Sequence, residues 1–394
     1  MPTATSAERP ADRPRVRFLA HGAERSGPPI VLLRWLRAWH LTDPGFDSEV
    51  VLARPGVLGS DYEHLTRVRT ARLDLRSPDR RIGRAVGVLG GSQVERAVIR
   101  AATLGRTGGG RADVVVVNGA TADGVRLLRM LPESPTLLVG HELSTGWMSN
   151  LDVDDRRLLL SRIGAVLAVS GAVRDYLVEQ HGVDPDIVSV IPPPVDPPDT
   201  LPARPVEVTR CVVLGGGVAD WRKAPELFVA AAHHCRRLAP EVDWEFRWFG
   251  GGSGTDPAGW PLEFEVARLG LTDVVTFLGP VDDPSSEFEH ADILLSTARE
   301  DAAPLVTAEA AGWGLPIVAF DSGGVEELID DGTCGTVVEY PDVVGLAQAV
   351  VDLARDPDRR EKLGRSGART VRATRRSDVV ASGVAAWIRA FLDP

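Results

Sequence analysis

Two acidic residues on either side of a proline are the part of this 394-residue chain best suited to chemistry. Asp301 precedes Pro304, and Glu309 follows it eight residues after Asp301. Pro304 is typical of the first turn of a helix, where its missing N–H costs no hydrogen bond, and Gly312 or Gly314 would end that helix. The spacing therefore predicts a short helix whose start follows an acidic loop.

The start of this predicted helix suits a phosphorylated ligand. The backbone amides of Leu305, Val306 and Thr307 would be free there, and the helix dipole favours an anion at the same place. Glu309 lies more than a turn further along and could bind both hydroxyls of a ribose. The alternative interpretation is that Glu300 and Asp301 form an ordinary acidic first turn and that Glu309 is a solvated helix residue.

A second candidate segment consists of a strand, a glycine loop and a helix start at residues 213–227. Gly216 and Gly217 would let the backbone approach a diphosphate closely, and we assign Gly250, after a later strand, to the same nucleotide site. Arg222 and Lys223 can neutralise the charge that develops on a departing nucleotide. Only two of the 44 basic residues are lysines, which favours a function for Lys223 over a simple turn.

Three further sequence features bear on possible catalytic, metal or dinucleotide sites. His141 follows an apolar run at 136–139 and is predicted at the carboxyl edge of a sheet, where a single histidine can be structural or catalytic. The DxD sequence that starts at Asp152 precedes a helical pattern, so we interpret it as a helix cap and predict no metal. No glycine run fits G-x-G-x-x-G, which disfavours a nicotinamide oxidoreductase.

Short apolar runs separated by segments of helix length must position these residues. In the first half they lie at 16–20, 49–52, 113–117, 136–139, 165–169 and 187–191, and in the second at 210–214, 245–249, 274–278, 293–296, 317–320 and 335–338. Because these runs do not alternate with polar residues, they predict parallel strands buried on both faces. The fold class is therefore α/β, with two Rossmann-like doubly wound domains facing a central cleft.

The domain boundaries follow from this division. We expect a disordered tail at 1–14, an N-terminal Rossmann-like domain at 15–196, a proline-rich linker at 197–207 and a C-terminal Rossmann-like domain at 208–375. A last helix at 376–394 could pack back on the N-terminal domain. Ligands of such folds bind at the carboxyl ends of the strands, so the cleft is where the site is expected.

The segment from Ser296 to Val318 resembles the E-x7-E element of the retaining GT-B-fold glycosyltransferases of family 4. The glycine loop that ends at Lys223 resembles the same family's donor-phosphate loop, with Ala224 in place of the usual glycine and Val218 in place of a common arginine. The first acid is Asp301, or Glu300 if the loop is one residue longer. The resemblance spans about residues 135–370.

This resemblance implies a metal-independent transferase that moves a sugar from a nucleoside diphosphate sugar to a small-molecule, glycan or lipid-linked acceptor with retention of configuration. Lys223 and Arg222 would stabilise the leaving diphosphate, Asp301 or Glu300 would bind the donor sugar, and His141 would line the cleft near the acceptor. No cofactor besides the donor is expected. A nucleotide-sugar 2-epimerase, a phosphorylase or a non-catalytic paralogue remain as alternatives on the same fold.

The charge and composition of the chain limit its possible binding partners and its cellular compartment. The net charge of −11 disfavours a nucleic-acid partner, because binding to phosphate backbones needs concentrated positive charge. Three scattered cysteines and the lack of a signal-peptide or membrane-spanning pattern predict a cytoplasmic protein. Eleven arginines between residues 67 and 111 form either a solvated surface or a contact with an anionic membrane.

Overall fold

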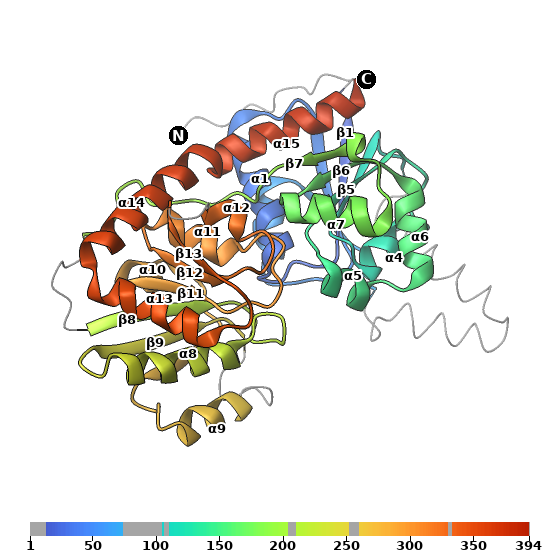
Figure 1. Cartoon of the computed structure of the whole chain (residues 1–394). Helices are drawn as coiled ribbons and strands as arrows, with labels where there is room; N and C mark the ends of the chain where they lie inside the picture. The colour runs from blue at the N-terminus through green and yellow to red at the C-terminus, as the bar shows by residue number, and fades with distance from the viewer. Residues whose placement is uncertain are drawn as a thin grey trace.

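The computed structural model describes residues 13–73, 105, 110–203, 210–251, 260–329 and 333–393. The chain forms two lobes, and each lobe is built on one parallel β-sheet (Figure 1). The strand order is β3-β2-β1-β4-β5-β6-β7 in the N-terminal lobe and β10-β9-β8-β11-β12-β13 in the C-terminal lobe. Both orders reverse direction next to the first strand of the lobe, as in doubly wound folds. The predicted α/β class with two Rossmann-like domains is confirmed.

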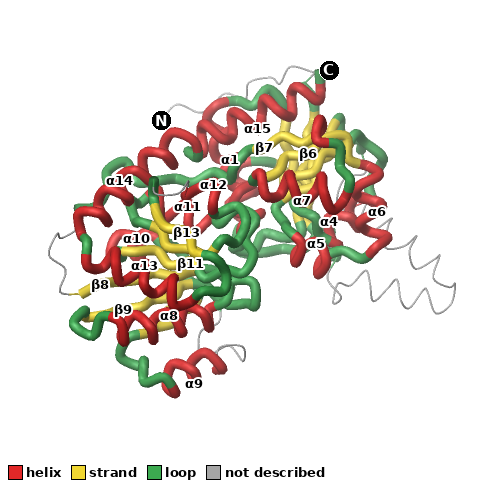
Figure 2. Tube along the Cα trace, in the orientation of Figure 1, coloured by secondary structure: helices red, strands yellow, loops and turns green. Residues whose placement is uncertain are grey.

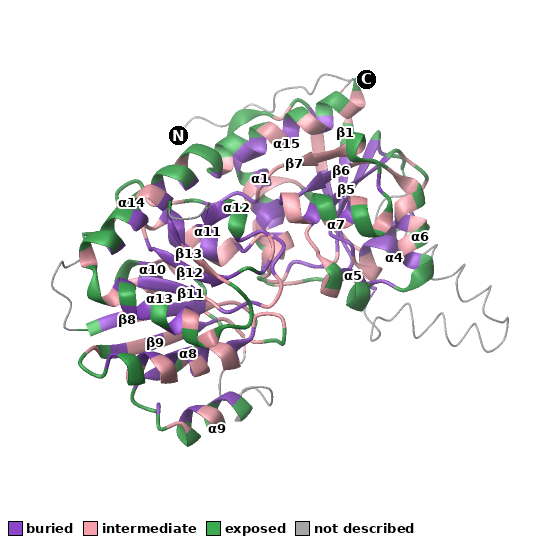
Figure 3. Cartoon of the chain, in the orientation of Figure 1, coloured by how far each residue is buried: buried purple, intermediate pink, exposed green. Residues whose placement is uncertain are grey.

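The N-terminal sheet contains β1 (Arg15–Ala20), β2 (Asp47–Leu52), β3 (Arg67–Thr70), β4 (Val114–Asn118), β5 (Thr136–Gly140), β6 (Ile163–Ala168) and β7 (Val188–Val190). Its helices are α1 (Gly27–Thr42), α2 (Gly59–Leu65), α4 (Ala122–Met130), α5 (Ser144–Asn150), α6 (Val153–Arg162), α7 (Gly171–His181) and the 3₁₀ turn η1 (Pro185–Ile187). Every residue of β4 and β5 is buried, because helices cover the sheet on both faces (Figure 3).

The C-terminal sheet contains β8 (Arg210–Gly216), β9 (Asp243–Phe249), β10 (Val275–Gly279), β11 (Ile293–Ser296), β12 (Ile317–Phe320) and β13 (Gly335–Val338). Its helices are α8 (Pro225–Leu238), α9 (Trp260–Arg268), α10 (Ser285–His290), α11 (Leu305–Gly312), α12 (Glu326–Ile329), α13 (Val343–Arg355) and α14 (Pro357–Thr374), and α15 (Ser377–Leu392) ends the chain. Loops from both lobes lie between the two sheets (Figure 2). The carboxyl ends of both sets of strands face this region between the lobes.

Strand β3 is an element that the sequence analysis missed. It pairs in parallel with β2 at the edge of the N-terminal sheet, in a register that places Arg67 beside Glu49. Its sequence, Arg-Val-Arg-Thr, lacks the continuous apolar run of the central strands, because an edge strand keeps one side open to solvent. The prediction for residues 67–111 falls mostly outside the described residues.

The C-terminal helix α15 packs against the N-terminal lobe. Val380, Val384 and Ile388 are buried in the same apolar cluster as α1. The indole Nε1 of Trp39 on α1 donates to the carbonyl of Ala381 at 2.8 Å. Figure 1 shows α14 and α15 running in succession from the C-terminal lobe onto the N-terminal lobe.

The chain therefore passes between the lobes twice, and the two passages contact each other. Val195 forms an isolated parallel bridge with Arg376, and its N–H donates to the carbonyl of Arg375 at 2.7 Å. Arg372 also donates to the carbonyl of Pro198 at 2.6 Å. This pairing joins the proline-rich segment to the start of α15.

Candidate active site

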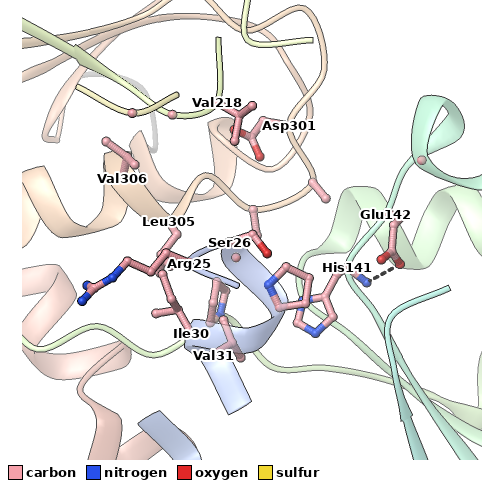
Figure 4. Close-up of a pocket in the computed structure, with 18 of the residues that line it drawn as sticks. Arg25, Ser26, Ile30, Val31, His141, Glu142, Val218, Asp301, Leu305 and Val306 are labelled. Atoms are coloured by element: carbon pink, nitrogen blue, oxygen red, sulfur yellow. Dashed lines mark hydrogen bonds between the residues drawn. The ribbon is translucent and has the colours of Figure 1, made fainter. Parts of the chain in front are cut away.

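A cleft of about 1280 Å³ separates the lobes at the carboxyl ends of both sheets. Loops that follow β1, β4 and β5 line it on the N-terminal side, and loops that follow β8, β9 and β11 line it on the C-terminal side. Figure 4 shows Asp301, Val218, Leu305 and Val306 on one side and His141 and Glu142 on the other. The residues singled out in the sequence come mainly from these loops.

The glycine loops after β8 and β9 contact each other at the cleft. Gly217 has a φ of 128°, and its N–H donates to the carbonyl of Phe249 at 2.9 Å. A Cβ on Gly250, which has a φ of 119°, would lie 2.0 Å from the carbonyl oxygen of Gly217. Gly217 and Gly250 line the cleft, whereas Gly216 packs beneath the ring of Phe249, where a Cβ would come within 2.6 Å. A larger residue at 250 would therefore separate the two loops, whereas one at 217 would press on the side chain of Lys223.

Lys223 and Asp301 form an ion pair at the C-terminal wall of the cleft. The Lys223 ammonium donates to Oδ2 of Asp301, and a guanidinium nitrogen of Arg222 lies 3.7 Å from Oδ1 of the same carboxylate. Arg222 also donates to the backbone carbonyl of Glu300 at 3.4 Å. The structure thus brings together two cations and one acid that the sequence analysis assigned to the diphosphate and the sugar.

Ala224, next to this lysine, has an unusual backbone conformation. It is the N-cap of α8 with φ 50° and ψ 56°, a left-handed conformation that glycine adopts without strain. Its N–H donates to the carbonyl of Asp220 at 3.0 Å, and the N–H of Lys223 donates to the Asp220 carboxylate at 2.9 Å. The tight turn that presents Lys223 therefore exists in spite of the alanine.

The structure separates the two neighbouring acids Glu300 and Asp301. The Asp301 carboxylate turns toward Lys223, while the Glu300 carboxylate crosses to the N-terminal lobe. There it accepts hydrogen bonds from the Ser144 hydroxyl at 2.8 Å and from the N–H of Thr145 at 3.0 Å. Asp301 is thus the acid that lies beside the cationic pair.

Helix α11 points its N-terminus into the cleft. Leu305 and Val306 line the cavity, and Pro304 is the buried N-cap that precedes them. The N–H of Ala308 donates to the Pro304 carbonyl at 3.0 Å, and by helix geometry the three preceding amides have no carbonyl within the helix. The helix start therefore offers backbone donors and a favourable dipole to an anion.

Glu309 is paired with an arginine that the sequence analysis did not single out. Arg34 of α1 donates to Oε1 of Glu309, and its Nε lies 3.2 Å from the carboxylate of Asp196. Burial raises the pKa of Glu309, and the positive charge of Arg34 opposes this rise. A ribose that binds to Glu309 would therefore share this carboxylate with Arg34 or replace it.

His141 is held by a chain of hydrogen bonds that determines which ring nitrogen carries the proton. The Asn118 side-chain amide nitrogen donates to the carbonyl of Pro28 at 3.1 Å, so its oxygen faces His141 Nε2 at 2.9 Å. Because that oxygen can only accept, Nε2 carries the proton and Nδ1 keeps a free lone pair. Burial, with a smaller contribution from His21, lowers the pKa of His141 to about 3. The imidazole is neutral at physiological pH.

Glu142, the next residue, is the second buried acid of this wall. Its Oε2 accepts from the N–H of Ala120 at 2.9 Å and from the N–H of His141 at 3.1 Å. Burial raises the pKa of Glu142 to about 7, although both backbone donors oppose the rise. The carboxyl group therefore connects the loop after β5 to the loop after β4.

Sequence reasoning missed Arg34 and Glu142, which line the cleft, and Asn118, which is buried next to His141. Asn118 could have been found, because it is a polar residue directly after the apolar run of β4. Arg34 carries no comparable signal in a chain so rich in arginine.

Outside the cleft, Asp152 caps α6 by accepting from the N–H of Asp155 at 2.7 Å, as predicted for the DxD sequence. Of residues 67–111, only 67–73, 105 and 110–111 are described.

Comparison with known proteins identifies both halves of the chain. Residues 35–198 match the family model described as Glycosyltransferase Family 4, and residues 209–356 match the model described as Glycosyl transferases group 1. A D-inositol 3-phosphate glycosyltransferase of Paenarthrobacter aurescens is 33% identical over 213 residues, which is 52% of this chain and 52% of that protein. One of Corynebacterium kroppenstedtii is 30% identical over 263 residues, 60% of this chain and 58% of that protein. The chain thus matches somewhat more than half the length of these relatives.

Solved structures share the architecture across nearly the whole chain. HepE of Anabaena, solved with UDP and glucose, superposes with a TM-score of 0.73 at 18% identity and covers 95% of this chain and 99% of that one. Sucrose-phosphate synthase of Thermosynechococcus elongatus superposes with a TM-score of 0.75 at 18% identity and covers 97% and 100%. Among the described residues, no helix is long and apolar enough to cross a bilayer. With family models over both lobes, the chain belongs to the group 1, family 4 glycosyltransferases and has their GT-B fold.

Proposed function

We propose that this protein transfers a glycosyl group from a nucleoside diphosphate sugar to an acceptor, with retention of configuration and without a metal ion. The observation that carries the proposal is the cationic pair Lys223 and Arg222 beside Asp301, in a cleft into which α11 also points its N-terminus. These groups come from two separate loops of one sheet edge. Their arrangement suits a bound pyrophosphate next to a sugar.

The chemistry requires stabilisation of a leaving group. As the bond between the anomeric carbon and the diphosphate breaks, negative charge increases on the phosphate oxygens while the sugar acquires oxocarbenium character. Lys223, Arg222 and the first amides of α11 would stabilise that negative charge. When a phosphate oxygen replaces Asp301 as the partner of Lys223, the Asp301 carboxylate becomes available to a hydroxyl of the donor sugar.

The remaining cleft residues divide between nucleotide and acceptor. Glu309 would bind the ribose, and the close approach of Gly217 and Gly250 would leave room for the nucleotide. His141, with Nδ1 as an acceptor, would face the reacting sugar and the acceptor. No cofactor beyond the donor enters this scheme.

The choice of donor and acceptor to test first follows from similar proteins. UDP is the first candidate nucleotide, because HepE was solved with UDP and with UDP-glucose. A phosphorylated cyclitol is the first candidate acceptor, because the relatives are named D-inositol 3-phosphate glycosyltransferases. The acceptor wall supports an anionic group, since Arg54 and Arg126 both lie 3.0 Å from the single carboxylate of Asp123.

A nucleotide screen followed by a product assay tests the proposal. One of UDP, GDP, ADP and dTDP should raise the melting temperature, because a ligand that binds only the folded protein stabilises it. The matching UDP-, GDP-, ADP- or dTDP-sugar should then release nucleoside diphosphate slowly without acceptor, at a rate that EDTA does not change. NMR of the transfer product should show the donor's anomeric configuration.

The same assay separates the alternatives. An epimerised donor sugar would indicate a 2-epimerase, and dependence on inorganic phosphate would indicate a phosphorylase. Nucleotide binding without any donor turnover would indicate a non-catalytic paralogue. If none of the four nucleotides shifts the melting temperature or gives heat in calorimetry, the proposed transfer is wrong.

A further inference from the structure

The carboxylate of Glu300, like the Arg34–Glu309 pair, spans the cleft between the two walls of the site. It extends from the loop between β11 and α11 in the C-terminal lobe to the first residues of α5 in the N-terminal lobe. Oε2 accepts from the Ser144 hydroxyl at 2.8 Å, and Oε1 accepts from the N–H of Thr145 at 3.0 Å and from the Thr145 hydroxyl. A carboxylate with three donors at a helix start is a strong, charge-assisted contact.

On the C-terminal side, Glu300 is the residue immediately before Asp301. The backbone of Asp301 is fixed, because its N–H donates to the Ser322 carbonyl at 2.7 Å and its carbonyl accepts from Gly324 at 2.9 Å. Its side chain, 8% exposed, pairs with Lys223. The Glu300 contact is therefore attached to a fixed backbone position next to the pair proposed to hold the diphosphate and the sugar.

On the N-terminal side, the residues that Glu300 contacts follow His141 closely. Ser144 is three residues after His141, and Glu142 between them holds the loop through the N–H of His141 and the N–H of Ala120. The loop from His141 to Thr145 is thus bound by one carboxylate from its own lobe and by one from the other lobe.

A second contact of the same kind provides a comparison. Glu327 at the start of α12 accepts from the N–H of Ala172 at 3.0 Å, in the first turn of α7, and so also joins a carboxylate of one lobe to a helix start of the other. Glu327 is not a sequence neighbour of Asp301, although Gly324, three residues before it, donates to the Asp301 carbonyl, and Ala172 is not a sequence neighbour of His141. Both contacts join a carboxylate of one lobe to a helix start of the other, but only Glu300 directly precedes Asp301 in the chain.

Resting on the proposed function, we propose that Glu300 is a positioning residue: by capping α5 across the cleft, it sets Asp301 and His141 at the correct distance for transfer. It does so without touching the nucleotide. Closure of the lobes and assembly of the reacting groups are then a single event. Misplacement of reacting groups by about 1 Å can cost on the order of 100-fold in rate, which is the scale of effect expected from losing this contact.

Three variants test this role in the full-length protein with UDP-glucose as the first donor. Glu300→Ala should lower kcat for transfer about 10- to 100-fold, while the Kd for UDP stays within about twofold of the wild type. Glu300→Gln should recover most of kcat, because its amide oxygen can still accept from Thr145. Glu327→Ala, the matched control, should change kcat by less than about threefold.

A partner-side variant and an independent measurement complete the test. Thr145→Val, which removes the hydroxyl donor, should cost little further activity when added to Glu300→Ala, because both changes act on one contact. Hydrogen exchange at 144–150 should increase in Glu300→Ala but not in Glu327→Ala, and exchange at 171–175 should show the reverse. This readout does not depend on turnover.

Several results would overturn the proposal. Wild-type kcat in Glu300→Ala, or equal losses in Glu300→Ala and Glu327→Ala, would remove the positioning role. Loss of UDP affinity in Glu300→Ala would place Glu300 in the nucleotide site instead. If the wild type binds no nucleotide while the exchange pattern appears as expected, the proposed function fails, and Glu300 is only a structural cap between the lobes.

Discussion

Lys223 and Asp301 are 78 residues apart in the chain, yet their side chains form one ion pair in the cleft. The Lys223 side chain is 13% exposed, so its charge is only partly screened by water. Gly217 makes room for it, since a Cβ there would lie 3.1 Å from Cε of the lysine. At the scale of single residues, the cleft therefore concentrates positive charge beside one acid.

Lys223→Ala should lower kcat about 100- to 1000-fold, because a preorganised cation that stabilises the leaving diphosphate is lost. The circular dichroism spectrum should stay unchanged. Lys362→Ala is the matched control, because Lys362 is the other lysine of the chain and is exposed on α14. Equal activity of both variants in a donor-release assay would exclude Lys223 from the chemistry.

Glu142 should make stability depend on pH in a defined direction. Its pKa in the folded protein is about 7, above its ordinary value of 4.5, so the folded state binds more protons between these values. Its contribution is therefore fully present below pH 4.5 and is lost as the pH rises through 7, by roughly 3 kcal/mol. Relative to the wild type, Glu142→Gln should gain melting temperature from pH 4.5 to pH 8.

Protonation of His141 changes the stability of the protein in the opposite direction, over a pH range that overlaps the one for Glu142. Its pKa in the folded protein is about 3, below the ordinary 6.5, so the unfolded chain binds the extra proton and stability falls as the pH drops below 6.5. Comparison of Glu142→Gln with the wild type cancels this contribution. A difference in melting temperature that stays constant with pH would show that Glu142 is ionised normally.

At the scale of elements, the turn before α8 places a residue with a Cβ in the left-handed backbone region that favours glycine. Ala224 is completely buried and has a left-handed conformation, which glycine adopts without strain. Left-handed backbone costs a residue with a Cβ roughly 1–2 kcal/mol. The turn is retained because Asp220 holds it through two hydrogen bonds.

Ala224→Gly should therefore be less destabilising than the same change at Ala232, a completely buried alanine inside α8. Both variants lose one buried methyl group, but only the first relieves left-handed strain. Ala232→Gly should lower the free energy of unfolding by about 1 kcal/mol or more, and the two variants should differ by about 2 kcal/mol. Equal melting temperatures would mean that position 224 is not strained.

At the scale of the whole molecule, the end of the chain stabilises the beginning. Helix α15 follows the C-terminal lobe but buries Val384 and Ile388 beside α1. The passage from Val195 to Pro198 pairs with residues 372–376 on the way. The two lobes are thus joined by two contacting segments, and α15 belongs to the core of the N-terminal lobe.

Ile388→Ala should weaken the N-terminal lobe, although residue 388 follows the entire C-terminal lobe. Removing a completely buried isoleucine side chain costs about 2–5 kcal/mol. Hydrogen exchange should increase in β1 and α1 and stay unchanged in α8. Leu363→Ala on α14, whose side chain lies in the C-terminal cluster, should produce the reverse pattern. Increased exchange in α8 alone after Ile388→Ala would contradict this assignment.

The sequence by itself determined the α/β class and the positions of nearly all strands. Buried parallel strands need continuous apolar runs, and such runs are visible without coordinates. It also indicated Lys223, because lysine is rare in this chain and only Lys362 accompanies it among the many arginines. The edge strand β3 was missed, because its alternating arginines and half-open position produce no apolar run.

Only the tertiary structure shows that Asp301 pairs with Lys223 while Glu300 contacts the opposite lobe, and only it brought Arg34 to Glu309, 275 residues away. Spacing along one chain cannot show which of two adjacent carboxylates faces a lysine and which faces the opposite lobe. The tautomer of His141 likewise depends on Asn118 and Pro28, which precede it by many residues. These contacts arise between distant segments that the sheets place at a common edge, and local pattern contains no record of them.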